Sequence, residues 1–252
     1  MTKSVTYQIY SQDPNNYGMI TFNPTIPWNT HRVEYKVTNV NTYSNFLITT
    51  KDDSITIETE SKYYAKNKTY NFTDKSSYDI DEMSTSLTNM FSDSGVTVSI
   101  NDSGCLELQG AGKLKITECS HRVQLLLGIY NMKLPIVSDE DNCIICASTP
   151  ILTYGNLLYL KSNQGNSFGM MLDDRSYHTP CIYRINQFLK SGIPLISDKK
   201  GDKIIVNAEA AKTITMQLVD FMYEPVILKS PMFVTVKIKM IPDGSLNQFA
   251  PH

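Results

Sequence analysis

The chain has 252 residues, which is enough to bury a substantial core as a single domain. Its formal net charge is −2 and no basic run is longer than Lys199-Lys200, so a nucleic-acid-binding groove is not expected. No apolar run reaches the roughly 18–20 residues that span a bilayer, and the start MTKSVTYQIY lacks the apolar segment of a signal peptide. We therefore expect neither membrane insertion nor direct contact with nucleic acid.

Residues 1–30 combine one predicted strand, Val5–Tyr10, with a polar turn and three prolines. Prolines at this density favour an extended arm or an edge segment over a central strand. We expect an N-terminal arm over 1–30. Two arrangements stay open for it: the arm lies across a neighbouring subunit, or the terminus folds on its own domain.

From Arg32 the strand signal is continuous. Apolar and polar residues alternate over Val33–Val37, as they do in a half-buried strand. Two apolar runs then flank Lys51–Ser54, a stretch of turn-forming residues, which predicts a hairpin over Phe46–Glu58. A further short strand is predicted at Thr69–Phe72.

The clearest helix signal comes next. Apolar residues recur every three or four positions, at Ile80, Met83, Leu87, Met90 and Phe91. This spacing predicts a helix with one buried face, and a carboxylate at Asp79 or Asp81 suits its N-cap.

After Gly95 the period changes to two, which predicts strands. The three segments concerned are Val96–Asn101, Leu106–Leu108 and Leu114–Ile116. We expect them to form a meander. Ser120 then suits the N-cap of a second helix, His121–Leu127, which is expected to end at Gly128.

The last third of the chain returns to strands. They are predicted at Leu157–Lys161, Cys181–Leu189, Ile193–Ile196, Lys203–Val206, Thr213–Val219 and Met232–Met240. Many short strands separated by turns, with two short helices, predict an all-β sandwich or barrel. No linker or repeat interrupts the chain, so one domain is expected over 1–252, with a tail at 242–252.

Five cysteines, an odd number without a secretory signal, indicate reduced thiols. Cys143 and Cys146 have the spacing of a zinc knuckle, and Cys119 and His121 lie upstream. The intervening isoleucines and the absence of a second such pair favour buried free thiols instead.

Other reactive groupings are weak. Cys181 and His178 are neighbours without a third catalytic partner. The acidic stretches Asp139–Asp141 and Asp173–Asp174 lack the pattern of a calcium loop and are typical of solvated turns. The sequence contains no phosphate loop, serine elbow or metalloprotease motif. We expect no enzymatic activity and assign no catalytic, cofactor or metal residue.

The order and spacing of four segments resemble those of the penton proteins of Polinton-like, adintovirus-like and adomavirus-like DNA viruses, which are related to adenoviruses. These penton proteins are small minor capsid proteins with one jelly roll. The segments are Phe46–Glu58, Tyr70–Phe91 with the meander 96–118 after it, Ser120–Ile129 (SHRVQLLLGI), and Leu157–Ile241 with LYLKSN, CIYRINQF, TITMQLVD and SPMFVTVKIKMI. Together they cover roughly residues 32–241.

This resemblance implies a single jelly roll of two antiparallel sheets that stands as a homopentamer at the fivefold vertices of a capsid. It implies contact with the major capsid protein, with a fibre or spike protein as a further partner, and it brings no catalytic residue. The implied location is the virion, after synthesis in the host cytoplasm and assembly in the host nucleus. Segments 11–30, 162–180 and 242–252 are the candidates for contacts with neighbours.

The sequence departs from adenovirus penton bases because no large inserted domain is evident in it, which argues against receptor binding by this subunit. Two other function classes stay open. A spike, fibre-head or lectin-like sandwich would bind a receptor or glycan, although the lone Trp28 gives little of a sugar-binding platform. A β-sandwich hydrolase or zinc enzyme would need a cluster of polar residues that the sequence does not reveal.

Overall fold

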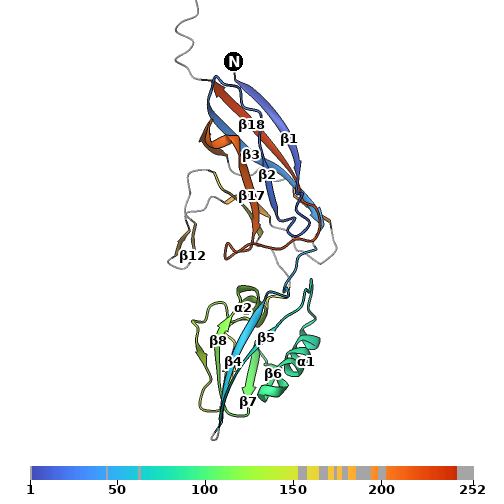
Figure 1. Cartoon of the computed structure of the whole chain (residues 1–252), viewed down its shortest axis with the longest axis vertical. Coiled ribbons are helices and arrows are strands. Elements are labelled where there is room, and N and C mark those ends of the chain that lie inside the picture. Colours follow the sequence, from blue (N-terminus) through green and yellow to red (C-terminus); the bar gives the residue numbers. More distant parts are fainter. Residues whose placement is uncertain are drawn as a thin grey trace, which may run out of the picture. The chain divides into compact units, whose positions relative to one another are not determined.

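The computed structural model describes residues 2–43, 45–61, 64–152, 158–164, 170–172, 175–177, 181–185, 194–197 and 203–242. Contacts within the chain divide it into two units. The first unit joins Met1–Phe46 to Gly155–His252, and the second is Leu47–Tyr154 (Figure 1). The single domain expected over 1–252 is therefore replaced by a first unit into which a second is inserted.

Strands dominate the first unit. They are β1 Lys3–Tyr10, β2 Met19–Phe22, β3 Thr30–Tyr43, β11 Leu158–Ser162, β12 Met170–Leu172, β13 Arg175–Tyr177, β14 Cys181–Ile185, β15 Pro194–Ser197, β16 Ile204–Asn207, β17 Ile214–Val219 and β18 Phe233–Pro242. A short 3-10 helix, η2, spans Ala210–Lys212. The predicted strands of the last third are confirmed where the structure describes them, with ends that shift by one or two residues. The part of the predicted strand Cys181–Leu189 beyond Ile185 lies outside the described residues.

The order of these strands defines the fold. One sheet has the order β1-β18-β3-β15, with β16 also pairing with β3, and the other has the order β14-β11-β17-β2. All of these pairings are antiparallel. Strands β15 and β16 follow one another along β3, so they occupy one strand position in the sheet. When the eight strand positions of these two sheets are numbered in chain order, the sheets have the orders 1-8-3-6 and 5-4-7-2. This is the arrangement of a jelly roll, a sandwich of two Greek keys, so the all-β jelly-roll expectation is confirmed.

The core of the jelly roll lies between the two sheets. Along β3 the side chains of Val33, Tyr35 and Val37 are buried, and the residues between them are not. The Tyr35 hydroxyl lies 2.7 Å from the Ser162 hydroxyl of β11, so one hydrogen bond joins the two sheets through the core.

The second unit contains the two α-helices found among the described residues. Its elements are β4 Ser54–Ser61, β5 Tyr64–Asn71, α1 Ile80–Phe91, η1 Ser92–Ser94, β6 Val96–Ile100, β7 Leu106–Gly110, β8 Lys113–Cys119, α2 His121–Leu127, β9 Ile136–Val137 and β10 Cys143–Ile145. They form one sheet in the order β5-β4-β8-β9 and another in the order β10-β7-β6. None of the helices in the described ranges is long and apolar enough to cross a bilayer.

Both predicted helices are confirmed. The Asp79 carboxylate caps α1 by accepting from the amides of Asp81 and Glu82, and α1 buries the predicted apolar face. Helix α2 ends at Gly128, whose positive φ of 72° lets its amide donate to the carbonyls of the last turn. Ser120 is the N-cap of α2, but its hydroxyl accepts from the Ser54 amide rather than from the helix.

Two predicted strand pairings are wrong. The turn near Lys51–Ser54 is present, but β4 pairs with β5 and β8, while Phe46 forms an isolated bridge with Leu228. The meander is also interrupted: β6 pairs with β7, but β8 joins β4 in the other sheet. Both predictions assume that apolar segments adjacent in sequence pair with each other. In the structure, the burial of one face of each strand determines the pairing, and it joins β4 to β8 across the intervening segments.

The N-terminal region does not form an arm over 1–30. Strand β1 pairs with β18 along all eight of its residues, and β2 pairs with β17. Each is the outermost strand of its sheet, which agrees with the edge segment that the prolines indicated. The tail beyond Pro242 lies outside the described residues.

The expected lack of an inserted domain is wrong as well. Leu47–Tyr154 is placed between β3 and β11 and has its own sheets, helices and buried residues. Its strands have the same periodicity as those of the jelly roll, so composition and periodicity indicated no boundary. The objection to receptor binding that depended on the missing insertion no longer applies.

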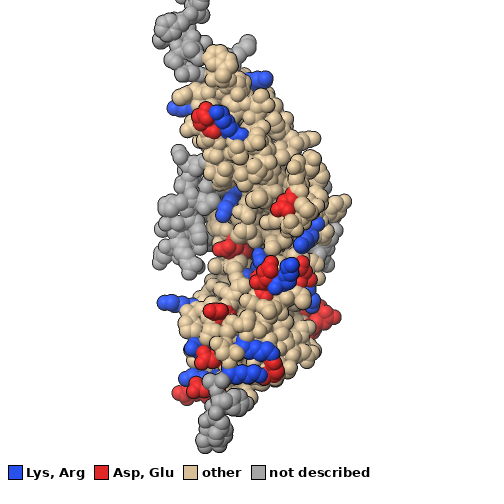
Figure 2. Space-filling model, viewed as in Figure 1, with Lys and Arg blue, Asp and Glu red and all other residues tan. Residues whose placement is uncertain are grey.

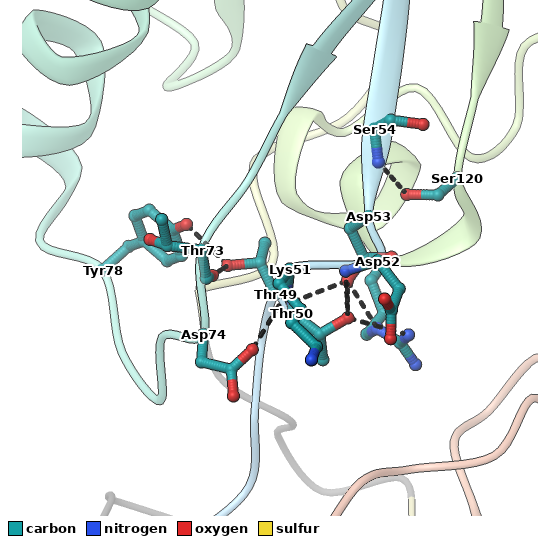
Figure 3. A network of polar contacts seen from close by, with 11 residues as sticks. Thr49, Thr50, Lys51, Asp52, Asp53, Ser54, Thr73, Asp74, Tyr78 and Ser120 are labelled. Atoms are coloured by element: carbon teal, nitrogen blue, oxygen red, sulfur yellow. Dashed lines mark hydrogen bonds and ion pairs between the residues drawn. The ribbon is translucent and has the colours of Figure 1, made fainter.

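A buried carboxylate organises the entry into β4 (Figure 3). The side chain of Asp53 is 3% exposed, and its Oδ2 accepts hydrogen bonds from the amide and the hydroxyl of Thr50 at 2.7 and 3.0 Å. The same oxygen pairs with Nε of Arg122, on α2, at 2.8 Å. Three donors thus satisfy a charge that burial alone would destabilise.

Further polar contacts surround this pair (Figure 3). The amide of Lys51 donates to Asp74, and the hydroxyl of Thr49 donates to the carbonyl of Thr73 at 2.8 Å. Thr49 and Tyr78 also share a hydroxyl contact of 2.7 Å. The network holds the segment before β4, the segment after β5 and α2 together within the inserted unit.

Replacing Arg122 by alanine is expected to lower the free energy of unfolding by about 3–5 kcal/mol, because it leaves the Asp53 carboxylate buried without its counter-ion. Chemical denaturation measures this loss. The control is Lys115→Ala, which removes the more exposed pair with Glu58 at 3.2 Å and should cost at most about 1 kcal/mol. Equal losses in the two variants would contradict this role of Asp53.

Burial raises the pKa of Tyr35 to about 12 from the ordinary 10.0, although the hydrogen bond with Ser162 opposes the rise. The folded state therefore keeps this proton at a pH where the unfolded chain releases it. The corresponding stability is complete below pH 10 and is lost as the pH rises towards about 12. Denaturant titrations across this range should show a steeper loss for the wild type than for Tyr35→Phe. Parallel curves would contradict the assignment.

Candidate assembly surface

The outer face of the sheet β1-β18-β3 carries a group of exposed aromatic side chains. Tyr10 and Phe233 lie directly opposite each other on β1 and β18, each with 54% of its surface exposed. Their ring centroids are 6.1 Å apart. Tyr43, 56% exposed, lies on β3 two residues beyond Asn41, the register partner of Phe233. We call Tyr10, Tyr43 and Phe233 the aromatic patch.

Strand direction places the aromatic patch at one end of the sheet. Tyr10 is the last residue of β1, Tyr43 is the last of β3, and Phe233 is the first of β18. Because β18 runs antiparallel to both neighbours, these three ends coincide. Exposed aromatic rings that are adjacent in space have the composition of the centre of a protein–protein interface.

The outer face of the second sheet differs. Tyr159 and Val219 lie opposite each other on neighbouring strands. Their side chains are on the outer face, because the adjacent Leu160 and Leu218 face inward. Tyr159 and Val219 are nevertheless buried, because Tyr223 stacks on Tyr159 with ring centroids 5.8 Å apart. The chain after β17 therefore covers part of this face, whereas nothing in the described residues covers the aromatic patch to the same degree.

Charge is distributed unevenly between the two units. The jelly-roll unit has 14 Lys and Arg against 10 Asp and Glu, and the inserted unit has 9 against 15. Figure 2 shows one face of the molecule, on which charged side chains of both signs are denser over the inserted unit than over the jelly roll. The lower density of charged side chains over the jelly-roll unit on this face is consistent with a subunit that buries part of its surface against other proteins.

The cysteines predicted as possible zinc ligands lie in the inserted unit. Cys146 is buried, and Cys119 and Cys143 are partly exposed. Burial raises the pKa of Cys119 and of Cys146 to about 12, so both are protonated thiols at neutral pH. Within the described ranges, no three His, Cys, Asp or Glu residues gather as a metal site would need.

The remaining predicted candidates are placed only in part. The Asp139 carboxylate accepts from the amides of Asp141 and Cys143, as in a turn. Cys181 belongs to β14, but its side chain is not described. His178, Asp173–Asp174 and most of segment 162–180 lie outside the described residues.

Sequence reasoning missed the aromatic patch, although a signal for it was present. Val5, Tyr7 and Ile9 alternate on the inward side of β1, so Tyr10 falls in the polar phase. Phe233 has the same relation to the buried Val234 of β18. An aromatic residue in the polar phase of a strand is therefore the pattern that would have indicated an exposed apolar surface.

Comparisons with known proteins add little to this description. No family model and no curated protein matches the chain. Among solved structures, the chain is similar to a mavirus penton protein, at 10% identity and a TM-score of 0.36, with 96% of this chain and 100% of that chain covered. It is also similar to the flagellar cap protein FliD of Escherichia coli, at 12% identity and a TM-score of 0.26, with 97% and 67% covered. Scores this low carry no argument, so the fold assignment depends on the strand order alone.

In the folded protein, iodoacetamide is expected to alkylate Cys119 and Cys146 much more slowly than Cys105, because burial raises the pKa of Cys119 and Cys146 and only a thiolate attacks. Peptide mass spectrometry of time points gives the three rates. In denaturant the rates should converge. Similar rates in the native protein would show that the two thiols are not protected.

Proposed function

We propose that this protein is a structural capsid protein of the penton type, which forms homopentamers at fivefold vertices and contacts the major capsid protein. The aromatic patch on the flank of a jelly roll is the observation that supports it most directly. Many functions share the β-sandwich, so the fold alone does not select this one. The resemblance in the order of sequence segments adds the capsid assignment, and the exposed flank adds a surface for self-association.

A pentamer requires a head-to-tail contact, in which the flank of one subunit meets a different surface of the next. The aromatic patch provides an apolar anchor on one flank of the jelly roll. The virion vertex is the corresponding location, and a fibre or spike protein is a further partner of the ring.

Receptor binding by a spike or fibre head is the second candidate. Trp28, in the connection between β2 and β3, is 90% exposed, which is unusual for the one tryptophan of a chain. Such a side chain can stack on a sugar ring or a partner side chain. Oligomeric state separates the candidates, because a fibre head is expected to be a trimer.

Light scattering after size exclusion, at several salt concentrations, tests the proposal. A species of five times 28.5 kDa supports the penton assignment. A stable trimer favours the spike or fibre head. A monomer that stays monomeric when the major capsid protein is added contradicts the assignment.

The double variant Tyr10→Ser/Phe233→Ser is expected to raise the protein concentration needed for pentamer formation at least tenfold, because it removes the apolar anchor. Ile145→Ser is the control, since Ile145 is similarly exposed, at 53%, but lies in the inserted unit. Circular dichroism confirms that each variant folds. If the double variant assembles like the wild type, the aromatic patch is not the assembly surface.

A further inference from the structure

The same outer face carries a lysine cluster away from the aromatic patch. Its members are Lys36 on β3, Lys237 and Lys239 on β18, and Lys203, which immediately precedes β16. They line a depression of about 380 Å³ together with Ser4 and Glu34. Three strands that are far apart in the sequence thus bring four ammonium groups onto one surface.

Only part of this charge is compensated. Glu34 lies 3.3 Å from Lys203 and 3.9 Å from Lys239. Lys36 and Lys237 make no ion pair with any described residue, although they lie directly opposite each other in the strand register. Like charges directly opposite on antiparallel strands destabilise the sheet. Such an arrangement is favourable when an anion lies over both lysines.

The residues around the cluster indicate the kind of anion. Ser4 and Thr6 of β1 lie opposite Lys239 and Lys237 and are exposed. Protein–protein interfaces are depleted in lysine and serine, and the aromatic residues of this face lie at its other end. Phosphate groups of nucleic acids, in contrast, are bound by lysine together with serine and threonine hydroxyls.

We propose that the lysine cluster binds the phosphate backbone of nucleic acid without reading its sequence. The expectation of no nucleic-acid contact depended on the absence of a basic run in the sequence. The fold assembles the cluster across strands instead, so no run is needed. The inference is independent of the penton assignment, because it requires only the outer face of one jelly roll.

Fluorescence anisotropy of the full chain with a short labelled DNA duplex tests this proposal. Between about 50 and 200 mM salt, the logarithm of the affinity should fall linearly with the logarithm of the salt concentration. Lys36→Gln/Lys237→Gln should weaken binding at least tenfold at the low-salt end, and reduce the slope by about 2. Duplexes of unrelated sequence should bind equally well.

The matched control is Lys113→Gln/Lys133→Gln, which removes the same charge from exposed positions of the inserted unit. It should leave binding within about twofold. The cluster variant should melt at the same temperature as the wild type or higher, because it removes a like-charge pair. This stability measurement separates lost binding from lost folding.

Three outcomes would overturn the proposal. The first is an absence of DNA binding by the wild type at about 50 mM salt. The second is an equal loss of affinity in the control and in the cluster variant. The third is competition by polyglutamate as strong as that by DNA at equal charge, which would identify an acidic protein surface as the partner instead.

Discussion

The alternation of side chains along β3 is the constraint on which the jelly roll depends. Val33, Tyr35 and Val37 face inward, so Glu34 and Lys36 must face outward. A slip of one residue in the register would bury the charges and expose the core. Because β3 pairs with β18, β15 and β16, its phase also sets which residues those strands expose. The hydrogen bond from Tyr35 to the opposite sheet adds a directional contact that holds this phase.

Local structure could be predicted from the sequence, and long-range pairing could not. The helix capped by Asp79 and the turn at Gly128 depend on a few neighbouring residues, so their signals are complete within a short window. The partner of β4 depends on which buried surfaces fit together after folding, and no window of sequence contains that information. The inserted unit was missed for the same reason, since its strands have the same period as those of the jelly roll.

Each of the two units buries its own set of apolar side chains. The inserted unit has a buried ion pair of Asp53 with Arg122 and its own set of buried apolar side chains. The jelly roll closes its two sheets from segments on both sides of the insertion. An insertion is tolerated where it takes the place of a loop that connects two strands of the host fold. The surface of each unit is therefore able to acquire a separate role.

The outer face of the jelly roll shows how one sheet can hold two kinds of surface. Its aromatic end is suited to burial against protein, because apolar rings gain most when water is excluded. Its lysine end is suited to an anion that stays hydrated at the edges, since an isolated ammonium group is costly to bury. Both surfaces arise from residues in the polar phase of β1, β3 and β18, where the core imposes no choice of side chain. Core packing does not determine the side chains at positions such as Phe233 and Lys237. These side chains are therefore the ones that indicate which partners the face binds.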